Sequence, residues 1–336
     1  MAKSKNILIT GAGGYIGTML ASKLHNSSLD CKIYGIDNFI YGHEQISRSL
    51  EKIKSNYVVF NHDVTKPDAF YDELIDMADV IIPLAAIVGM PACKKQPTLA
   101  QSVNVDAISY IISKVNKNQL VIFPNTNSGY GTVLDGVCTE DTLLNAISLY
   151  GKQKDQAEQI VKQHTNSVVF RLATACGVSY RHRLDLLVNT LVYEAHTTNK
   201  IGIFDEGAYR NYIHVEDICS AFIFAIKHSD RMRDNVFNLG NDSINMTKGQ
   251  LARVIAGVFK RLYNRKIVVT STDGNDPDKR DYQVSSQKLY NYGWNPKLNL
   301  PTTISELMTL YIGWDDMAKE FGEDALALLR AKMINI

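Results

Sequence analysis

Tyr150 and Lys154 are the two residues whose types and spacing most clearly suggest chemistry. On a helix, residues four apart lie on one face. A free tyrosine has a pKa of about 10 and is a poor base at neutral pH, but a neighbouring ammonium stabilises the phenolate and lowers that pKa. The phenolate can then take the proton of an alcohol. The same spacing also occurs on helix faces that meet only solvent, so the prediction needs further support.

The glycine-rich turn TGAGGYIG, residues 10–17, is a second feature with chemical meaning. Gly11 permits a tight turn, Gly14 lets the backbone approach a pyrophosphate, and Gly17 lets helix and strand pack closely. The exposed amides and the positive end of the following helix can then hold an anion. A tight turn that binds nothing is the alternative, but an expected strand before the turn and an expected helix after it favour the phosphate site.

Asp37 indicates which dinucleotide would bind. It ends the second expected strand, 20 residues after Gly17, where a carboxylate accepts hydrogen bonds from the adenosine ribose and repels a 2′-phosphate, so NAD is favoured over NADP. A turn-forming aspartate before Asn38 is the alternative. With NAD in place, Tyr150 could remove a hydroxyl proton while hydride leaves the carbon for the cofactor. The hydroxyl of Thr126, just after an expected strand, could orient the reacting oxygen.

These residues need a scaffold of parallel strands to bring them together. Apolar runs predict strands at 6–10, 31–36, 57–60, 80–84, 120–123 and 168–172, with helices at 103–115 and 148–163 among the connections. Crossovers of this length imply a doubly wound α/β (Rossmann) fold, a parallel sheet with helices on both faces. We expect an NAD-binding domain at 1–172, to which 205–240 returns. Residues 173–204 and 241–336 would form a smaller α/β substrate-binding cap.

Composition and charge exclude several classes of function. The 336 residues include 36 Lys and Arg and 35 Asp and Glu, a balance that gives no general attraction to nucleic acid or to acidic membranes. Five cysteines without C-x-x-C spacing argue against a disulfide framework or a metal site and favour a reducing cytoplasm. The longest apolar run, 80–90, is interrupted by Pro83 and Gly89 and is too short for a membrane span.

Several further short motifs follow one another along nearly the whole chain. They are the turn at 10–17, Asp37-Asn38, Asp63-Val64, Leu84-Ala85-Ala86, Asn104, Thr126 with Tyr130-Gly131, Tyr150 with Lys154, RNYIHVED at 210–217 and GWNP at 293–296. In this order and spacing they resemble the extended short-chain dehydrogenases/reductases, namely the NAD-dependent nucleotide-sugar epimerase/dehydratase family typified by UDP-glucose 4-epimerase.

The resemblance implies two sets of contacts. The cofactor would meet Gly11, Gly13, Gly14, Tyr15, Ile16, Gly17, Asp37, Asn38, Asp63, Val64, Leu84, Ala85, Ala86, Asn104, Tyr150 and Lys154. The substrate would meet Asn127, Ser128, Thr174, Asn189, Phe204, Arg210 and Arg280. Both arginines suit a diphosphate, and Phe204 would lie beside the nucleotide base. Alternatively, Arg280 is an ordinary surface arginine and Asn189 is an ordinary asparagine on a helix, and neither contacts the substrate.

Two departures from the family pattern narrow the function. The family's dehydratases carry Asp-Glu after the catalytic threonine, where this chain has Asn127-Ser128, and neither side chain can act as a carboxylate acid or base. Thr174 replaces the asparagine that is usual in its segment. The basic segment 179–183 either contacts an anionic substrate or is a solvated loop, and an acid/base role for His182 is a minor alternative.

The motifs together predict a 4-epimerase acting on a nucleotide-diphosphate sugar in carbohydrate biosynthesis. Hydride from C4 would pass to NAD and return to the other face of a 4-keto sugar. An NAD-dependent C4 dehydrogenase uses the same residues and stays open, whereas a 4,6-dehydratase is less favoured. A non-catalytic NAD-binding protein is least favoured, because Thr126, Tyr150 and Lys154 are all present. The family implies a homodimer through helices at roughly 95–116 and 150–163, and the cysteines favour the cytoplasm. The nucleotide and sugar stay open.

Overall fold

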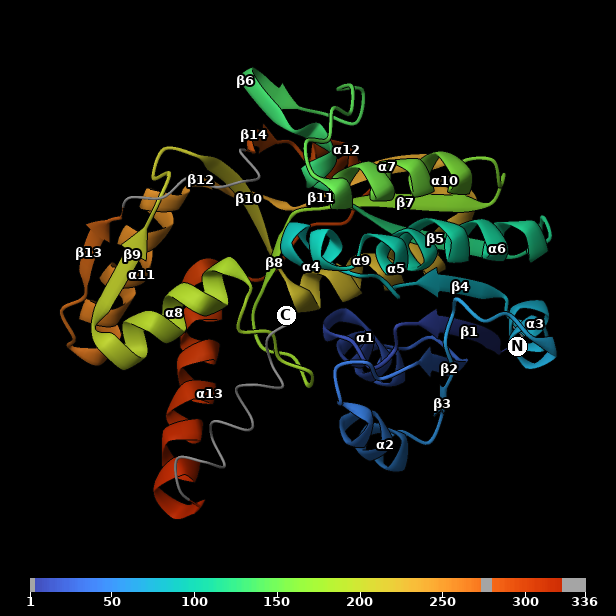
Figure 1. Cartoon of the computed structure of the whole chain (residues 1–336), viewed down its shortest axis with the longest axis horizontal. Coiled ribbons are helices and arrows are strands. Elements are labelled where there is room, and N and C mark those ends of the chain that lie inside the picture. The colour runs from blue at the N-terminus through green and yellow to red at the C-terminus, as the bar shows by residue number, and fades with distance from the viewer. Residues whose placement is uncertain (1–3, 273–279, 322–336) are drawn as a thin grey trace.

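A seven-stranded parallel sheet forms the centre of the protein (Figure 1). The computed structural model describes residues 4–272 and 280–321. Across the sheet the strands are β11 (Asn235–Leu239), β7 (Ser167–Leu172), β5 (Leu120–Thr126), β4 (Val80–Pro83), β1 (Lys5–Thr10), β2 (Cys31–Asp37) and β3 (Tyr57–Asn61). All neighbouring pairs are parallel. The strand order reverses at β1, so the expected doubly wound fold is confirmed.

Helices cover both faces of this sheet. They are α1 (Tyr15–His25), α2 (Glu44–Ile53) and α9 (Val215–Lys227) on one face, and α3 (Ala69–Met77), α6 (Ala107–Lys114) and α7 (Leu149–Val161) on the other. Strand β1 shows why two faces are needed, because successive side chains of a strand point to opposite sides. Ile7 and Ile9 enter the core under α1 and α9, and Leu8 enters the core under α3 and α6.

The segment expected to be helical at 103–115 begins earlier and is less regular than predicted. The chain forms α4 (Met90–Lys95), α5 (Pro97–Gln101), a π-helical turn η1 (Ser102–Asp106) and then α6. Asn104 lies in the π-helical turn, and its buried side chain bonds the main chain of Ile87 at 2.9 and 3.1 Å. It also donates to Gln153 of α7 at 3.1 Å. Apolar periodicity does not distinguish such a turn from an ordinary helix, and π-helical turns are frequent near functional sites.

Three small sheets lie beside the main sheet. They pair β8 (Thr174–Cys176) with β10 (Tyr209–His214) and β12 (Asn241–Thr247), β9 (Lys200–Ile203) with β13 (Val268–Ser271), and β6 (Thr132–Cys138) with β14 (Asp281–Val284). The remaining helices are η2 (Asn127–Tyr130), α8 (Leu187–Thr198), α10 (Ser229–Met232), α11 (Lys248–Tyr263), α12 (Gln287–Asn291) and α13 (Leu300–Phe321). Helices α8, α11 and α13 share a second core and lie with β9 and β13 on the left of Figure 1.

The part of the chain that the structure describes contains neither a membrane-spanning helix nor a metal-binding cluster. None of the helices there combines the length and apolar character that crossing a membrane requires. Nor does any group of three or more His, Cys, Asp or Glu side chains there have an arrangement suited to a metal ion. All five cysteines are buried and free.

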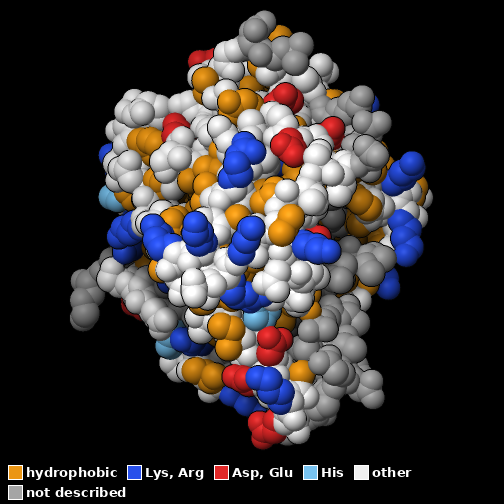
Figure 2. All heavy atoms as spheres, turned by 90° about the vertical axis from the view of Figure 1, so that its left-hand side faces the viewer, with side chains coloured by type: hydrophobic (Ala, Val, Ile, Leu, Met, Phe, Trp, Pro, Cys, Tyr) orange, Lys and Arg blue, Asp and Glu red, His pale blue; other side chains and the backbone are white. Residues whose placement is uncertain are grey.

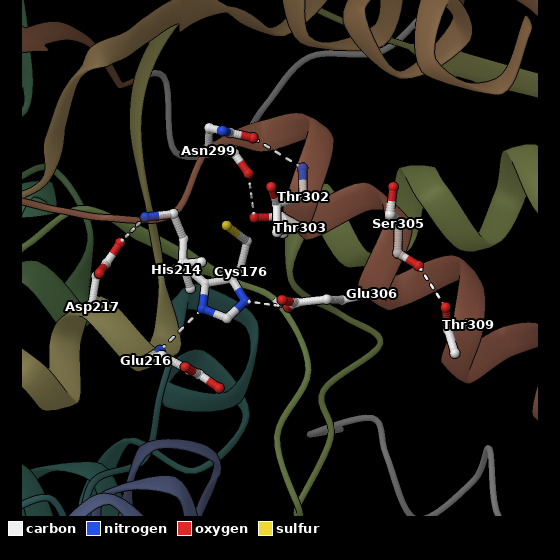
Figure 3. A network of polar contacts seen from close by, with 12 residues as sticks. Cys176, His214, Glu216, Asp217, Asn299, Thr302, Thr303, Ser305, Glu306 and Thr309 are labelled. Carbon is white, nitrogen blue, oxygen red and sulfur yellow. Dashed lines mark hydrogen bonds and ion pairs between the residues drawn. The ribbon is translucent and has the colours of Figure 1, made fainter. Parts of the chain in front are cut away.

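A network of polar contacts joins α13 and the segment before it to α9 (Figure 3). The His214 ring accepts a hydrogen bond from the Glu216 amide at Nδ1, 3.2 Å, so its Nε2 carries the proton and donates to Glu306 of α13 at 3.0 Å. The buried Asp217 carboxylate accepts the amide protons of Lys297 and Leu298, each at 3.0 Å. These contacts hold the second core against the main sheet.

We expect Asp217→Asn to lower the free energy of unfolding by about 1–3 kcal/mol, because one buried backbone donor would then face an amide NH₂ rather than an acceptor. Urea unfolding followed by circular dichroism measures the loss. The neighbouring Glu216→Gln is a matched control, since the Glu216 side chain is 38% exposed in its ion pair with Lys23 and such pairs contribute at most about 1 kcal/mol. Equal losses in the two variants would contradict the role given to the Asp217 contacts.

Candidate active site

A cavity of about 680 Å³ lies at the carboxyl ends of the central strands. In doubly wound sheets ligands bind at this edge, where the strand order reverses. The expected cofactor residues that line it are Gly11, Gly13, Gly14, Tyr15, Ile16, Gly17, Asp37, Asn38, Val64, Leu84, Ala85, Ala86, Tyr150 and Lys154. Of the expected substrate residues, Ser128, Thr174, Phe204, Arg210 and Arg280 line the cavity, as does Thr126. The fold therefore gathers most of the predicted site into one space.

The glycine turn forms one wall of the cavity, and two of its glycines are sterically required. Gly11 has φ +70°, and a Cβ there would lie 2.5 Å from the amide nitrogen of Ala85. A Cβ on Gly17 would lie 2.4 Å from the carbonyl oxygen of Gly11. Gly14 caps α1, and no side chain in the described part of the chain accepts a hydrogen bond from the first turn of that helix. The amides and positive end of α1 are thus available to an anion in the cavity.

The Asp37 carboxylate is fixed at the mouth of this turn. It accepts hydrogen bonds from the amides of Gly13 at 2.9 Å and Phe39 at 2.7 Å. Burial raises the pKa of Asp37 above its ordinary value, while the two amides and the nearby Arg181 guanidinium act against that shift. The carboxylate lines the cavity and can accept further hydrogen bonds from a ribose. This arrangement fits the adenosine end of NAD.

Helix α7 presents Tyr150 and Lys154 to the same cavity. The helix begins after Ser148, whose hydroxyl accepts from the Gly151 amide at 3.2 Å. Desolvation raises the pKa of Tyr150 to about 12, and the charges of Arg183 and Arg280 act in the opposite direction. Desolvation also lowers the pKa of Lys154 to about 7. Cations placed around the phenol are therefore what would make it a base.

Thr126 and Ser128 line the same cavity as Tyr150 and Lys154. The Thr126 hydroxyl caps η2 by accepting from the Ser128 amide at 3.2 Å, and it donates to the Ser128 hydroxyl at 3.1 Å. Arg280 donates a short hydrogen bond to that same hydroxyl. Arg210, which is 4% exposed, donates to the carbonyl oxygens of Tyr209 and Arg280. One chain of contacts therefore runs from the threonine to both expected diphosphate arginines.

Four of the expected site residues do not line the cavity. Asp63 accepts from the amide and hydroxyl of Thr65 in the turn after β3. Asn104 bonds the main chain of Ile87, and Asn189 bonds the main chain of Gly177 and Arg183. Asn127 is 1% exposed, and neither of its amide atoms has a hydrogen-bond partner within the described part of the chain. Asn104 and Asn189 lie behind the wall and position the segments that do line it.

The basic segment 179–183 packs against α1 and is no solvated loop. The Ser179 hydroxyl donates to the Tyr15 carbonyl at 2.6 Å, and Tyr15 donates to the Gly177 carbonyl at 2.9 Å. Arg181 and Arg183 line the cavity, which favours the alternative of an anion contact. His182 instead packs against Tyr311 and Trp314, and burial lowers its pKa to about 4. Since His182 does not line the cavity, nothing in its placement supports an acid/base role.

The cavity also contains residues that the motifs did not indicate. Arg183 is paired with Asp185 at 2.5–3.0 Å, and the charge of Arg183 acts on Tyr150. Arg181 lies with its guanidinium carbon 5.1 Å from the ring centre of Tyr41. Lys248 opens α11 and also lines the wall. Nothing in the sequence distinguishes Lys248 from any other lysine that follows a helix-capping threonine. Its position in the cavity wall follows only from the pairing of β10 with β12.

Comparisons with known proteins agree with this geometry. A family model described as "NAD dependent epimerase/dehydratase family" matches residues 7–240. A UDP-glucose 4-epimerase from Lactobacillus helveticus is 25% identical over 316 residues, covering 87% of this chain and 92% of the relative. A dTDP-D-glucose 4,6-dehydratase from Homo sapiens is 22% identical, covering 92% and 90%.

Among solved structures, a UDP-glucuronic acid 4-epimerase from Bacillus cereus, in complex with UDP-glucuronic acid and NAD, is similar with a TM-score of 0.79. The two chains are 21% identical, and the likeness covers 91% of this chain and 100% of that one. At this identity the likeness speaks for the shared fold, including the smaller sheets beside the main one.

Proposed function

The chain belongs to the NAD-dependent epimerase/dehydratase family, and from that premise we propose that it epimerises C4 of a nucleotide-diphosphate sugar through a 4-keto intermediate. One observation carries the proposal: Thr126, Tyr150 and Lys154 line the same cavity as the glycine turn and the arginines Arg210 and Arg280. The 4-epimerases among the relatives and solved structures support the choice of reaction.

The residues present fit NAD, the cofactor of the family. The uncapped start of α1 suits a pyrophosphate, and the tight turn before it requires glycine because a Cβ on Gly11 or Gly17 would overlap the backbone. Asp37 suits the ribose hydroxyls. Bound there, the cofactor supplies an acceptor and donor of hydride for the sugar carbon.

The protein's own groups would manage the proton and the position of the sugar. The Tyr150 phenolate takes the proton of the C4 hydroxyl as the C4–H bond breaks, and it later returns that proton to the 4-keto oxygen. The Thr126 hydroxyl orients the reacting oxygen, and the Lys154 ammonium stabilises the phenolate. Arg210 and Arg280 hold the diphosphate, so the keto sugar can turn about its link to the diphosphate and accept hydride on its other face.

The surroundings of Thr126 favour this reaction over water elimination. A 4,6-dehydratase needs an acid and a base at the sugar, but Asn127 is buried away from the cavity and Ser128 bonds Arg280. Neither residue titrates as a carboxylate. The second candidate is an NAD-dependent C4 dehydrogenase, because the same three residues would serve it. It differs in releasing the keto sugar and requiring separate reoxidation of the cofactor.

Incubation of the purified protein with UDP-glucose, UDP-N-acetylglucosamine and UDP-glucuronic acid, each without added NAD, tests the proposal. We expect proton NMR to show the C4 epimer of at least one sugar at its equilibrium ratio, with mass spectrometry showing NAD carried through purification. Accumulation of a keto sugar together with one equivalent of reduced cofactor would establish the dehydrogenase instead. Loss of water from the sugar would establish a dehydratase.

We further propose that the protein is a homodimer that serves carbohydrate biosynthesis, as the family resemblance implies, and that it is cytoplasmic, as its five free cysteines favour. The helices expected at the dimer contact correspond to the region from α5 to α6 and to α7. Helices α6 and α7 pack together over β5 and β7 on one face of the sheet, where Ile108 of α6 and Ala157 of α7 share a core. Their outward sides would form the contact.

A further inference from the structure

Two acidic side chains of α7, Asp155 and Glu158, face β5 behind the cavity wall. The amide group of Asn125, which is 1% exposed, donates to Asp155 at 3.3 Å and to Glu158 at 2.5 Å. Arg171 of β7 donates to both oxygens of Glu158, at 2.7 and 3.1 Å. In the described part of the chain, only Glu158 of this pair forms an ion pair with an arginine. The charge of Asp155 can therefore act on other neighbours.

The Asp155 carboxylate contacts residues on both sides of Thr126. A Cβ on Gly129 of η2 would lie 2.5 Å from Oδ1 of Asp155, so any other residue there would displace the carboxylate. On the other side, the side-chain oxygen of Asn125 accepts the amide proton of Thr126 at 2.7 Å. The Thr126 hydroxyl in turn donates to Ser128, the residue before Gly129. Asp155 thus helps to fix the segment that carries this hydroxyl.

Lys154 is the charged neighbour that Asp155 can support. It is 4% exposed, and its ammonium lies 4.1 Å from the centre of the Phe123 ring. Phe123 and Asn125 stand two residues apart on β5, so both face α7. Burial lowers the pKa of Lys154, and the charges of Asp155 and Glu158 act against that shift. A buried ammonium needs such compensation.

We propose that Asp155 is a positioning residue: its carboxylate aligns Thr126 through the contacts on either side, and its charge sustains the Lys154 ammonium. This inference rests on the proposed function, in which both residues serve the reaction. Asp155 does not line the cavity, so it acts through residues that do. The ionised form is the one that serves, because hydrogen bonds to a charged acceptor are roughly twice as strong as neutral ones.

The isosteric Asp155→Asn removes the charge and keeps the shape. At pH 8 we expect kcat about tenfold below the wild type, the effect of losing one charged hydrogen bond, with KM changed less than about twofold because Asp155 does not meet the substrate. Turnover is followed by NMR with whichever of UDP-glucose, UDP-N-acetylglucosamine and UDP-glucuronic acid the wild type converts fastest. Retained NAD, measured by mass spectrometry, shows that the variant is folded.

The pH dependence of this loss separates the charge from the shape. Burial raises the pKa of Asp155 to about 6. The charged groups around it are Lys154 and Glu158 of α7 and Arg171 of β7, while β5 and η2 present a side-chain amide and the backbone of a glycine. Below about pH 6 the wild-type carboxyl takes up a proton and resembles the asparagine. The ratio of wild-type to variant kcat should therefore fall from about ten at pH 8 toward one at pH 5.

Gly129→Ala tests the steric contact. We expect turnover to fall about tenfold, because the added methyl group displaces the carboxylate of Asp155. In the Asp155→Ala background the same change should cost less than about twofold, since space is then available. Equal losses in both backgrounds would contradict the alignment of Thr126 by this contact.

The support of Lys154 can be measured without a substrate. In protein labelled with ¹³C-lysine, the Lys154 Cε signal is identified by its absence from Lys154→Met. We expect it to titrate near pH 7 in the wild type, and at lower pH in Asp155→Asn because one compensating charge is lost.

A matched control comes from α13. Figure 1 shows the lower end of this helix well away from α7, and Figure 2 views that side of the molecule, where acidic and basic side chains lie together at the bottom. The Asp316 side chain is 67% exposed and pairs with Lys319 at 3.0 Å. Asp316→Asn removes the same charge at the surface, and we expect it to change neither the kcat profile nor the Lys154 titration.

Two results would overturn the role of the Asp155 charge. One is a kcat ratio that stays constant from pH 5 to pH 8, and the other is a Lys154 signal that titrates at the same pH in Asp155→Asn and the wild type. Failure of the proposed function looks different, because the wild type would then convert none of the three UDP-sugars. The Lys154 titration still decides the role of Asp155 in that case.

Discussion

Tyr150→Phe is expected to lower kcat for the sugar by about a thousandfold or more, because a positioned acid–base group typically contributes factors of 10²–10⁴. The substitution removes one hydroxyl and keeps the ring that fills the wall between α7 and the cavity. NAD binding should survive, since the glycine turn and Asp37 are untouched. Turnover followed by NMR and bound NAD followed by mass spectrometry measure the two effects separately.

Tyr263→Phe is the control for this change. Tyr263 ends α11 and does not line the cavity, so loss of its hydroxyl should leave turnover within about twofold of the wild type. Comparable turnover in Tyr150→Phe and the wild type would remove Tyr150 from the reaction. Loss of NAD from Tyr150→Phe would mean that the tyrosine serves the binding of the cofactor.

Lys154→Met is expected to abolish turnover and yet to stabilise the cofactor-free protein near neutral pH. Burial lowers the pKa of Lys154 from its ordinary 10.5 to about 7. Between these two values the unfolded chain binds the proton and the folded chain does not, so the stability of the wild type rises with pH. We expect the methionine variant to exceed the wild type by about 1 kcal/mol or more at pH 7, an advantage that fades toward about pH 10.

Chemical denaturation of both proteins across this range measures the difference. Asp155 titrates below the range, because burial raises its pKa to about 6, and groups common to both proteins cancel. Lys152→Met on the exposed side of α7 is the control and should show no pH-dependent difference from the wild type. A difference between Lys154→Met and the wild type that stays constant with pH would contradict the shifted pKa.

The strands of the main sheet and the glycine turn could be predicted from the sequence, because each depends on a short run of neighbouring residues. Apolar runs bounded by polar segments predict the strands of the main sheet, and long crossovers require those strands to be parallel. The glycine turn is specific because an added Cβ would overlap the backbone at Gly11 and Gly17. The family and the NAD cofactor are confirmed. Thr126 ends β5 at the cavity, and Tyr150 and Lys154 line the same cavity from α7.

Features that depend on distant pairings could not be predicted. Strand β6 pairs with β14 across more than 140 residues, and β10 pairs with β12 in a register that sets Lys248 beside Phe204. Asn104 and Asn189 match motif positions, yet their amides bond main-chain groups behind the wall. A motif identifies such a residue as part of the site, but only the fold distinguishes a ligand contact from a supporting one.

One edge strand of the main sheet, β11, has a consequence for how the chain acquires its structure during synthesis. Strand β11 covers β7, although 62 residues separate Leu172 from Asn235. Until that later segment leaves the ribosome, β7 offers a row of unsatisfied amide and carbonyl groups, the kind of edge that invites aggregation. A fragment ending near residue 172 would therefore be expected to form inclusion bodies, whereas one that extends through residue 239 would bury this edge.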